Sequence, residues 1–64
     1  MKIDKLQAIA KGKGLRLDYS PADECYVMYD RRTGDALMLY NDFSLKMMDD
    51  RGWRTECNKL RPNN

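Results

Sequence analysis

Apolar residues near the start of the chain recur at the three- and four-residue spacing of a helix. These residues are Ile3, Leu6, Ile9 and Ala10. Asp4 is a candidate N-cap, and Gln7, three residues later, completes a capping-box-like pattern. Gly12 and Gly14 supply the backbone freedom that commonly ends a helix. The pattern therefore predicts an opening helix that stops at these glycines.

The middle of the chain alternates apolar and polar residues at the two-residue period of a strand. Residues 15–19 form the first such segment, and the proline-containing turn 20–23 ends it. Residues 25–30 and 36–40 form two more segments, which flank a turn that contains Gly34. This glycine suits the left-handed position of a type I turn followed by a G1 bulge. We therefore predict three antiparallel strands.

A second helix is expected after the third strand. Asn41 and Asp42 are candidate N-caps, and Ser44 is the alternative. Gly52 is a candidate C′ residue, which would end the helix and bring Trp53 back onto its last turn.

The order of these elements predicts an α+β fold with two layers: a helix, a three-stranded antiparallel sheet and a second helix. Residues 53–57 alternate, so they form either a short fourth strand or an ordered tail. Residues 58–64 are expected to fray. Residues 1–64 are expected to form a single small α+β domain, because a chain this short builds only one core. The expected core residues are Leu6, Ile9, Leu15, Leu17, Val27, Leu37, Leu39, Phe43, Leu45, Met48 and Trp53.

The formal net charge is +2, and the charges are unevenly distributed. Residues 1–16 carry five basic side chains against Asp4 alone, whereas the charged side chains of residues 17–30 are all acidic. This order predicts a dipolar surface rather than a uniform positive field. The pI of about 8.6 also lies below the range above about 9 that is usual for nucleic-acid-binding domains.

No apolar run approaches the roughly 20 residues that span a membrane. The first residues also lack the long apolar segment of a secretory signal. We therefore expect a cytoplasmic protein that does not enter the membrane. In that compartment Cys25 and Cys57 should be reduced thiols, and a disulfide between them is the alternative for a secreted chain.

The motifs that would indicate a catalytic or metal site are missing from this chain. It has no histidine, the commonest general base and metal ligand. Cys25 and Cys57 form no zinc motif, and Gly12 and Gly14 lack the spacing of a phosphate-binding loop. We therefore expect no enzymatic activity, no cofactor and no metal.

Two helices can cover only one face of the predicted sheet. We assign Tyr26, Met28, Met38 and Tyr40 to the uncovered face, where they would form an apolar binding surface. The alternatives are that residues 53–60 cover this face, or that the side chains only reflect strand propensity.

Arg31 and Arg32 lie at the tip of the predicted hairpin. They form either a basic rim to the apolar surface or a solvated turn, and the pair by itself favours the solvated turn.

The layout of the chain resembles the small single-domain proteins of phages and prophages, a class that includes anti-CRISPR inhibitors. The resemblance is carried by MKIDKLQAIAKGKG, as a capped opening helix, and by YDRRTGDALMLYNDFSLKMM, as a hairpin plus helix. It implies a viral protein in the cytoplasm of a bacterial host, which binds and inhibits or modulates a host protein complex. Binding would use a mixed apolar and charged face.

The order helix, three strands, helix also resembles the double-stranded-RNA-binding domain, which contacts phosphates from the start of its second helix. In this chain the matching segment 41–51 carries two basic residues beside three acidic ones. Nucleic-acid binding is therefore the alternative function. Its candidate residues are Lys5, Lys11, Lys13 and Arg16, together with the hairpin arginines. A homodimer joined through the exposed sheet face is a third interpretation.

Overall fold

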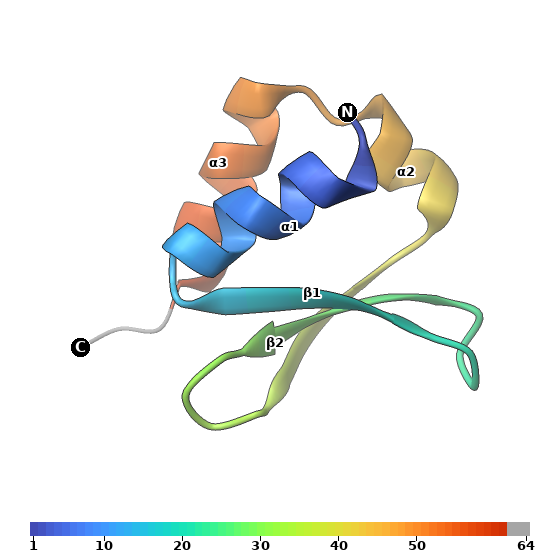
Figure 1. Ribbon diagram of the computed structural model, residues 1–64, viewed down its shortest axis with the longest axis vertical. Helices are drawn as coiled ribbons and strands as arrows, with labels where there is room; N and C mark the ends of the chain where they lie inside the picture. Colours follow the sequence, from blue (N-terminus) through green and yellow to red (C-terminus); the bar gives the residue numbers. More distant parts are fainter. Residues whose placement is uncertain (62–64) are drawn as a thin grey trace.

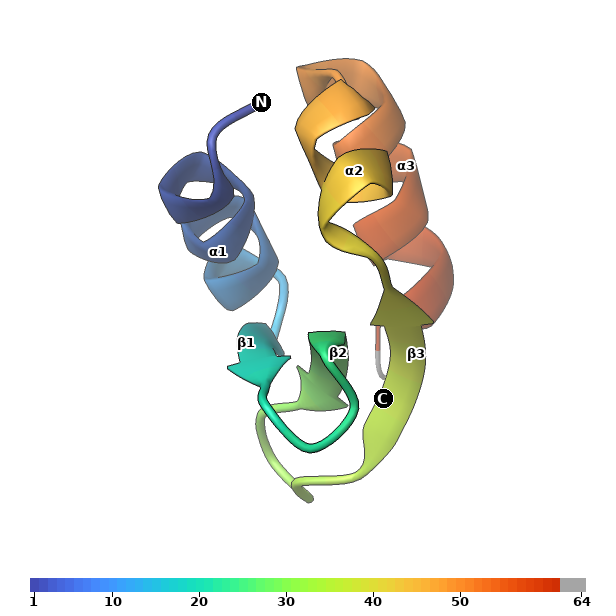
Figure 2. The same ribbon diagram turned by 90° about the vertical axis from the view of Figure 1, so that its right-hand side faces the viewer.

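The computed structural model describes residues 1–61. The helices are α1 (Ile3–Gly12), α2 (Asp42–Met47) and α3 (Asp50–Leu60), and the strands are β1 (Leu15–Ser20), β2 (Cys25–Asp30) and β3 (Ala36–Tyr40). All three helices lie on one side of the sheet, as Figure 1 and Figure 2 show. The α+β class with two layers is therefore confirmed.

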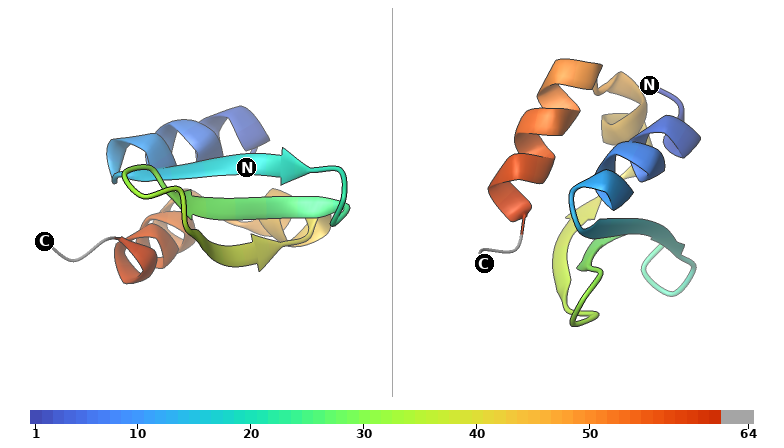
Figure 3. Two further views of the ribbon diagram at one scale, coloured as in Figure 1. Left: turned by 90° about the horizontal axis from the view of Figure 1, so that it is seen from below. Right: turned by 60° about the vertical axis from the view of Figure 1, so that its left-hand side comes forward.

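The three strands form an antiparallel sheet in the order β1-β2-β3, so β1 and β3 are its edges (Figure 3). Leu17 pairs with Met28, which pairs in turn with Met38 on β3. Directly paired residues project on the same face of a sheet. Leu17 is buried beneath the helices, so this whole row belongs to the helix-facing side.

The turn between β2 and β3 has the predicted chemistry. Gly34 has a φ of 81°, a left-handed conformation that favours glycine, and its N–H donates to the Asp30 carbonyl at 2.8 Å. The Asp30 carboxylate accepts from the N–H groups of Arg32 and Thr33. The sheet register also shifts between Met28 and Tyr29, which is a bulge.

The predicted cap of the first helix is wrong. The N-cap position is Lys2, which makes no side-chain cap bond, and Asp4 lies inside the first turn. Gln7 instead donates from its amide to the Leu17 carbonyl at 3.0 Å, which ties α1 to β1. A tertiary hydrogen bond has therefore replaced the local one that the sequence pattern suggested.

The second half of the chain forms two helices where one was expected. Asn41 caps α2 as predicted, because its side chain accepts from the Ser44 N–H at 2.6 Å. The helix ends before Gly52, and Asp49 then caps α3 by accepting from the Gly52 N–H at 2.7 Å. Gly52 therefore lies in the first turn of a new helix rather than at the end of an old one. Residues 53–57 are helical, neither a strand nor a tail.

The expected fraying of residues 58–64 agrees only in part with this arrangement. Residues 58–60 belong to α3, and residues 62–64 lie outside the described part of the chain.

Trp53 is at the centre of the core. Its side chain is fully buried, its indole N–H donates to the Leu6 carbonyl at 2.9 Å, and its ring meets the Tyr40 ring edge to face at 5.5 Å. The buried cluster is Leu6, Ala10, Leu15, Leu17, Met28, Tyr40, Leu45, Trp53 and Cys57. Three residues predicted to be in the core are instead exposed, and they are Leu37, Leu39 and Phe43.

Candidate functional site

The predicted apolar binding surface faces the helices rather than the solvent. Met28 is fully buried, Tyr40 is buried, and Tyr26 packs partly buried against the core cluster. Of the four residues assigned to the open face, only Met38 is exposed, at 45%. The placement of Tyr26, Met28 and Tyr40 on a solvent face is therefore wrong.

The error has a simple geometric cause. The turn between β1 and β2 spans residues 21–24, and this length pairs Ser20 with Cys25, hence Tyr19 with Tyr26 and Leu17 with Met28. Leucines at alternate positions of β1 therefore require the tyrosine and methionine of β2 to face inward with them. Counting the register from this turn would have given the right face.

Tyr40 joins the sheet to α3 through its hydroxyl. The phenol donates to a carboxylate oxygen of Glu56 at 2.5 Å, and Cys57 lies buried next to that residue. Burial, followed by the bond to Glu56, raises the pKa of Tyr40 far above its ordinary value. Burial also raises the pKa of the Cys57 thiol to about 11. These buried groups stabilise the fold while they are neutral, and they are not poised for reaction.

We expect the free energy of unfolding to decrease as the pH rises above about 9, the ordinary pKa of a cysteine thiol. Below that pH Cys57 and Tyr40 are protonated in both states, so their contribution is fully present. Above it the unfolded chain loses its protons first, which favours unfolding until the folded thiol titrates near 11. The thiol alone should lose on the order of 2 kcal/mol across this window.

Urea unfolding at a series of pH values measures this effect. Cys57→Ala should shift the start of the decrease upward, to the region where an unfolded tyrosine ionises, whereas Cys25→Ala should leave it near pH 9. A constant free energy of unfolding up to pH 11 would contradict the protonated assignments.

The face of the sheet that the helices leave open carries a different set of side chains. Val27 lies there between its register partners Asp18 and Leu39, and it is buried among strand neighbours rather than in the main core. Arg16 stacks over the Tyr29 ring, with its guanidinium carbon 4.8 Å from the ring centroid, and also pairs with Asp18 at 2.7 Å. The β1 side of this face is thus charged, and the β3 side is apolar.

Exposed apolar side chains concentrate on β3 and the helix that follows it. Five of the six large exposed apolar residues of the described chain lie within residues 37–47, and the sixth is Tyr19. We call these five the β3–α2 apolar surface: Leu37, Met38, Leu39, Phe43 and Met47. Sequence reasoning placed three of them in the core, because alternation identifies two faces but does not say which one is covered.

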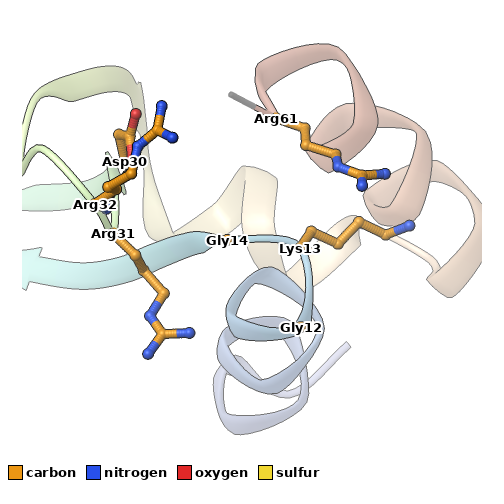
Figure 4. Close-up of a pocket in the computed structure, with 7 residues that line it drawn as sticks. All are labelled: Gly12, Lys13, Gly14, Asp30, Arg31, Arg32 and Arg61. Atoms are coloured by element: carbon orange, nitrogen blue, oxygen red, sulfur yellow. Dashed lines mark hydrogen bonds between the residues drawn. The ribbon is translucent and has the colours of Figure 1, made fainter. Parts of the chain in front are cut away.

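Basic side chains gather at the C-terminal end of α1. A hollow of about 460 Å³ is lined by Gly12, Lys13, Gly14, Asp30, Arg31, Arg32 and Arg61. Figure 4 shows the hairpin arginines on one side of Gly14 and the side chains of Lys13 and Arg61 on the other. The fold therefore brings the hairpin arginines next to Lys13, as the nucleic-acid alternative requires, and it adds Arg61, which no predicted set contained.

The remaining basic candidates are placed differently. Arg31 donates to the Lys11 carbonyl at 3.3 Å, so Lys11 borders the same region. Arg16 is engaged with Asp18, and Lys5 lines a separate hollow with Met1, Lys2 and Asp4. Lys5 therefore does not belong with the other candidates.

No group of three or more metal-ligating side chains occurs within residues 1–61, and both cysteines there are free thiols. None of the helices in that part of the chain is long and apolar enough to cross a membrane. Comparison with protein-family models, with curated proteins and with solved structures finds no match to this chain. The resemblances to phage-encoded inhibitors and to the double-stranded-RNA-binding domain stay predictions.

Proposed function

We propose that this chain is a binding domain without catalytic activity, and that it docks a protein partner by adding a partner strand to the free edge of β3. The observation that carries the proposal is the exposure of residues 36–39 on an edge strand that contains neither a charge nor a proline. An edge strand offers unpaired backbone N–H and C=O groups, which an extended peptide can satisfy.

The two edges of the sheet differ in the way this proposal requires. β1 carries Arg16 and Asp18, whose ion pair lies on the strand itself, and charges on an edge discourage pairing with another chain. β3 reads Ala-Leu-Met-Leu-Tyr and carries no such charge. The β3 edge combines free backbone groups with uncharged, exposed residues at the four successive positions 36–39, so it is the edge suited to a partner.

The helix after β3 extends the apolar surface. Phe43 and Met47 are 72% and 70% exposed, and their four-residue spacing places them on one side of α2. Leu45, between them, is buried, so this side of the helix faces away from the core. Strand addition at β3 would supply backbone hydrogen bonds, and these apolar side chains would supply buried area and selectivity.

The partner that best fits the earlier resemblance is a subunit of a host protein complex, which the chain would inhibit or modulate by occupying a surface of it. This assignment is supported only by the layout of the chain and by the lack of charge on β3. A second copy of the chain could use the same edge, which would give a homodimer.

We expect Leu39→Lys to abolish docking while leaving the fold intact, because Leu39 is 59% exposed and its replacement puts a charge on the edge strand. Ala8→Lys adds the same charge at an exposed position of α1, outside the β3–α2 apolar surface, and is the matched control. The wild-type chain and both variants would be used as bait in lysate of the cell that makes the chain, and each would be sedimented to measure its mass.

A protein retained by the wild-type chain and by Ala8→Lys, but lost by Leu39→Lys, supports strand addition. Equal retention by all three chains would contradict it. So would a wild-type chain that retains nothing and stays monomeric at high concentration.

A further inference from the structure

The basic side chains at one end of the molecule come from three separate parts of the fold. Lys11 and Lys13 belong to the C-terminal end of α1, Arg31 and Arg32 to the hairpin between β2 and β3, and Arg61 to the C-terminal end of α3. We call these five residues the basic end. They are far apart in sequence, so only the fold brings them together around the hollow at Gly12–Gly14.

Helix electrostatics explains part of this arrangement. Basic residues stabilise the negative end of a helix, which accounts for Lys11 at the end of α1 and for Arg61 just beyond α3. Arg31 also satisfies the Lys11 carbonyl. Arg32 has neither role: it is exposed, lies on the hairpin and forms no side-chain ion pair within residues 1–61. Its side chain is therefore accessible to an external anion.

None of the ion pairs within residues 1–61 involves a residue of the basic end. Among the described residues 1–61, Asp30 is the one carboxylate that lines the hollow, and one of its oxygens accepts from the backbone N–H groups of Arg32 and Thr33. Asp50 lies at the first residue of α3, eleven residues before Arg61 and so about 16 Å away along the helix. Four basic side chains against one carboxylate leave the hollow with an excess of positive charge.

We propose that the basic end binds the phosphate backbone of duplex nucleic acid without regard to its sequence. Lys13, Arg31, Arg32 and Arg61 would each contact phosphate oxygens, and Lys11 would add to the local positive potential. Unlike the protein docking proposed for β3, this binding uses none of the residues of the β3–α2 apolar surface.

A polymer of phosphates fits the hollow better than a single small anion does. The side chains in Figure 4 extend in different directions from Gly14 rather than converging on one point. Arginines and lysines spread in this way match successive phosphates along a backbone. In the part of the chain that the structure describes, no aromatic ring lines the hollow, so those residues offer no platform on which the bases of a single strand could stack. Both features favour a duplex backbone.

Fluorescence anisotropy with a labelled DNA duplex of about 20 base pairs tests the proposal, with salt varied from about 50 to 300 mM and protein up to about 1 mM. Three or four phosphate contacts predict a slope of roughly −3 to −4 when log K is plotted against log salt. Arg32→Gln should reduce the magnitude of that slope by about 1 and weaken binding roughly fivefold to tenfold at 0.1 M salt.

Arg51→Gln is the matched control, because Arg51 is also an exposed arginine but lies in the first turn of α3, at the other end of that helix from Arg61. It should change neither slope nor affinity beyond the small effect of net charge. Lys13→Gln should behave like Arg32→Gln, and the double variant should lose about two units of slope. Far-UV circular dichroism confirms that each variant is folded.

Competition distinguishes the sources of the anion. The proposal is supported if unlabelled DNA or RNA duplex displaces the labelled duplex from the protein. Poly-glutamate and ATP, at an equal concentration of carboxylate or phosphate, should not displace it. Displacement by poly-glutamate would instead indicate an acidic protein surface, and displacement by ATP would indicate a small phosphate ligand. Either result would overturn the proposal, and so would equal losses in Arg32→Gln and Arg51→Gln.

Discussion

Trp53→Ala is expected to unfold most of the protein at room temperature. The ring is fully buried, and its loss leaves a cavity between α1, α3 and the sheet, which should cost about 3–5 kcal/mol. The same change removes the hydrogen bond to the Leu6 carbonyl and the edge-to-face contact with Tyr40. A core in a chain of this size rarely supplies more than about 3–5 kcal/mol in total, so this single change consumes nearly all of it.

Trp53→Phe provides the control for this prediction. It keeps an aromatic ring against Tyr40 but removes the indole N–H, so it should destabilise the protein by less than the alanine variant does. Urea unfolding monitored by far-UV circular dichroism measures both. A folded Trp53→Ala protein with nearly wild-type stability would show that the indole lies outside the core.

Met28→Ala is expected to cost about 2–5 kcal/mol of stability, because Met28 is fully buried in the centre of the sheet. Met38 provides an unusually close comparison: it is the same residue type, pairs directly with Met28 across β2 and β3, and shares its face. It lies at the open edge, however, and is 45% exposed. Met38→Ala should therefore cost less than about 1 kcal/mol.

The contrast between the two methionines tests which face of the sheet the helices cover. If the helices covered the other face, both variants would be stable and Leu39→Ala would be the damaging change. Chemical denaturation of all three variants under one set of conditions decides between the two arrangements. Similar losses in Met28→Ala and Met38→Ala would contradict the burial that the structure gives them.

Local chemistry in the sequence was sufficient to predict most of the elements. The helical period of the first segment, the two-residue alternation of the next three, and the cap at Asn41 all reappear in the structure. Gly34 takes the left-handed conformation that its turn requires. These features depend only on residues a few positions apart in the chain, so they can be predicted from the sequence.

The boundary between the last two helices was harder to predict because two local signals compete there. Gly52 favours the C′ position, which would end one helix. Asp49, three residues earlier, favours the N-cap position, which would start another. In the structure the Asp49 carboxylate accepts from the Gly52 N–H, and Trp53 is drawn into the core one residue later. Burial of the indole then favours a helix over residues 53–57, although apolar and polar residues alternate there as they do in a strand.

The candidate sites depended still more on the fold. Arg31 and Arg32 were identified from the sequence. They lie next to Lys13 and Arg61 only because the C-terminal ends of α1 and α3 lie close to the hairpin between β2 and β3. Leu39 was assigned to the core as part of one alternating strand face and Phe43 because it is apolar, and both are exposed.

By itself, the sequence determined the class of the fold, the approximate positions of its three strands along the chain and the absence of histidine. Those properties follow from short-range periodicity and from composition. Only the tertiary structure decided which side of the sheet is covered, where α3 begins, and which basic residues share one hollow. The physical reason is that a strand with apolar residues on both faces can bury either one, and the choice is made by the strand register and by the helices that pack against it.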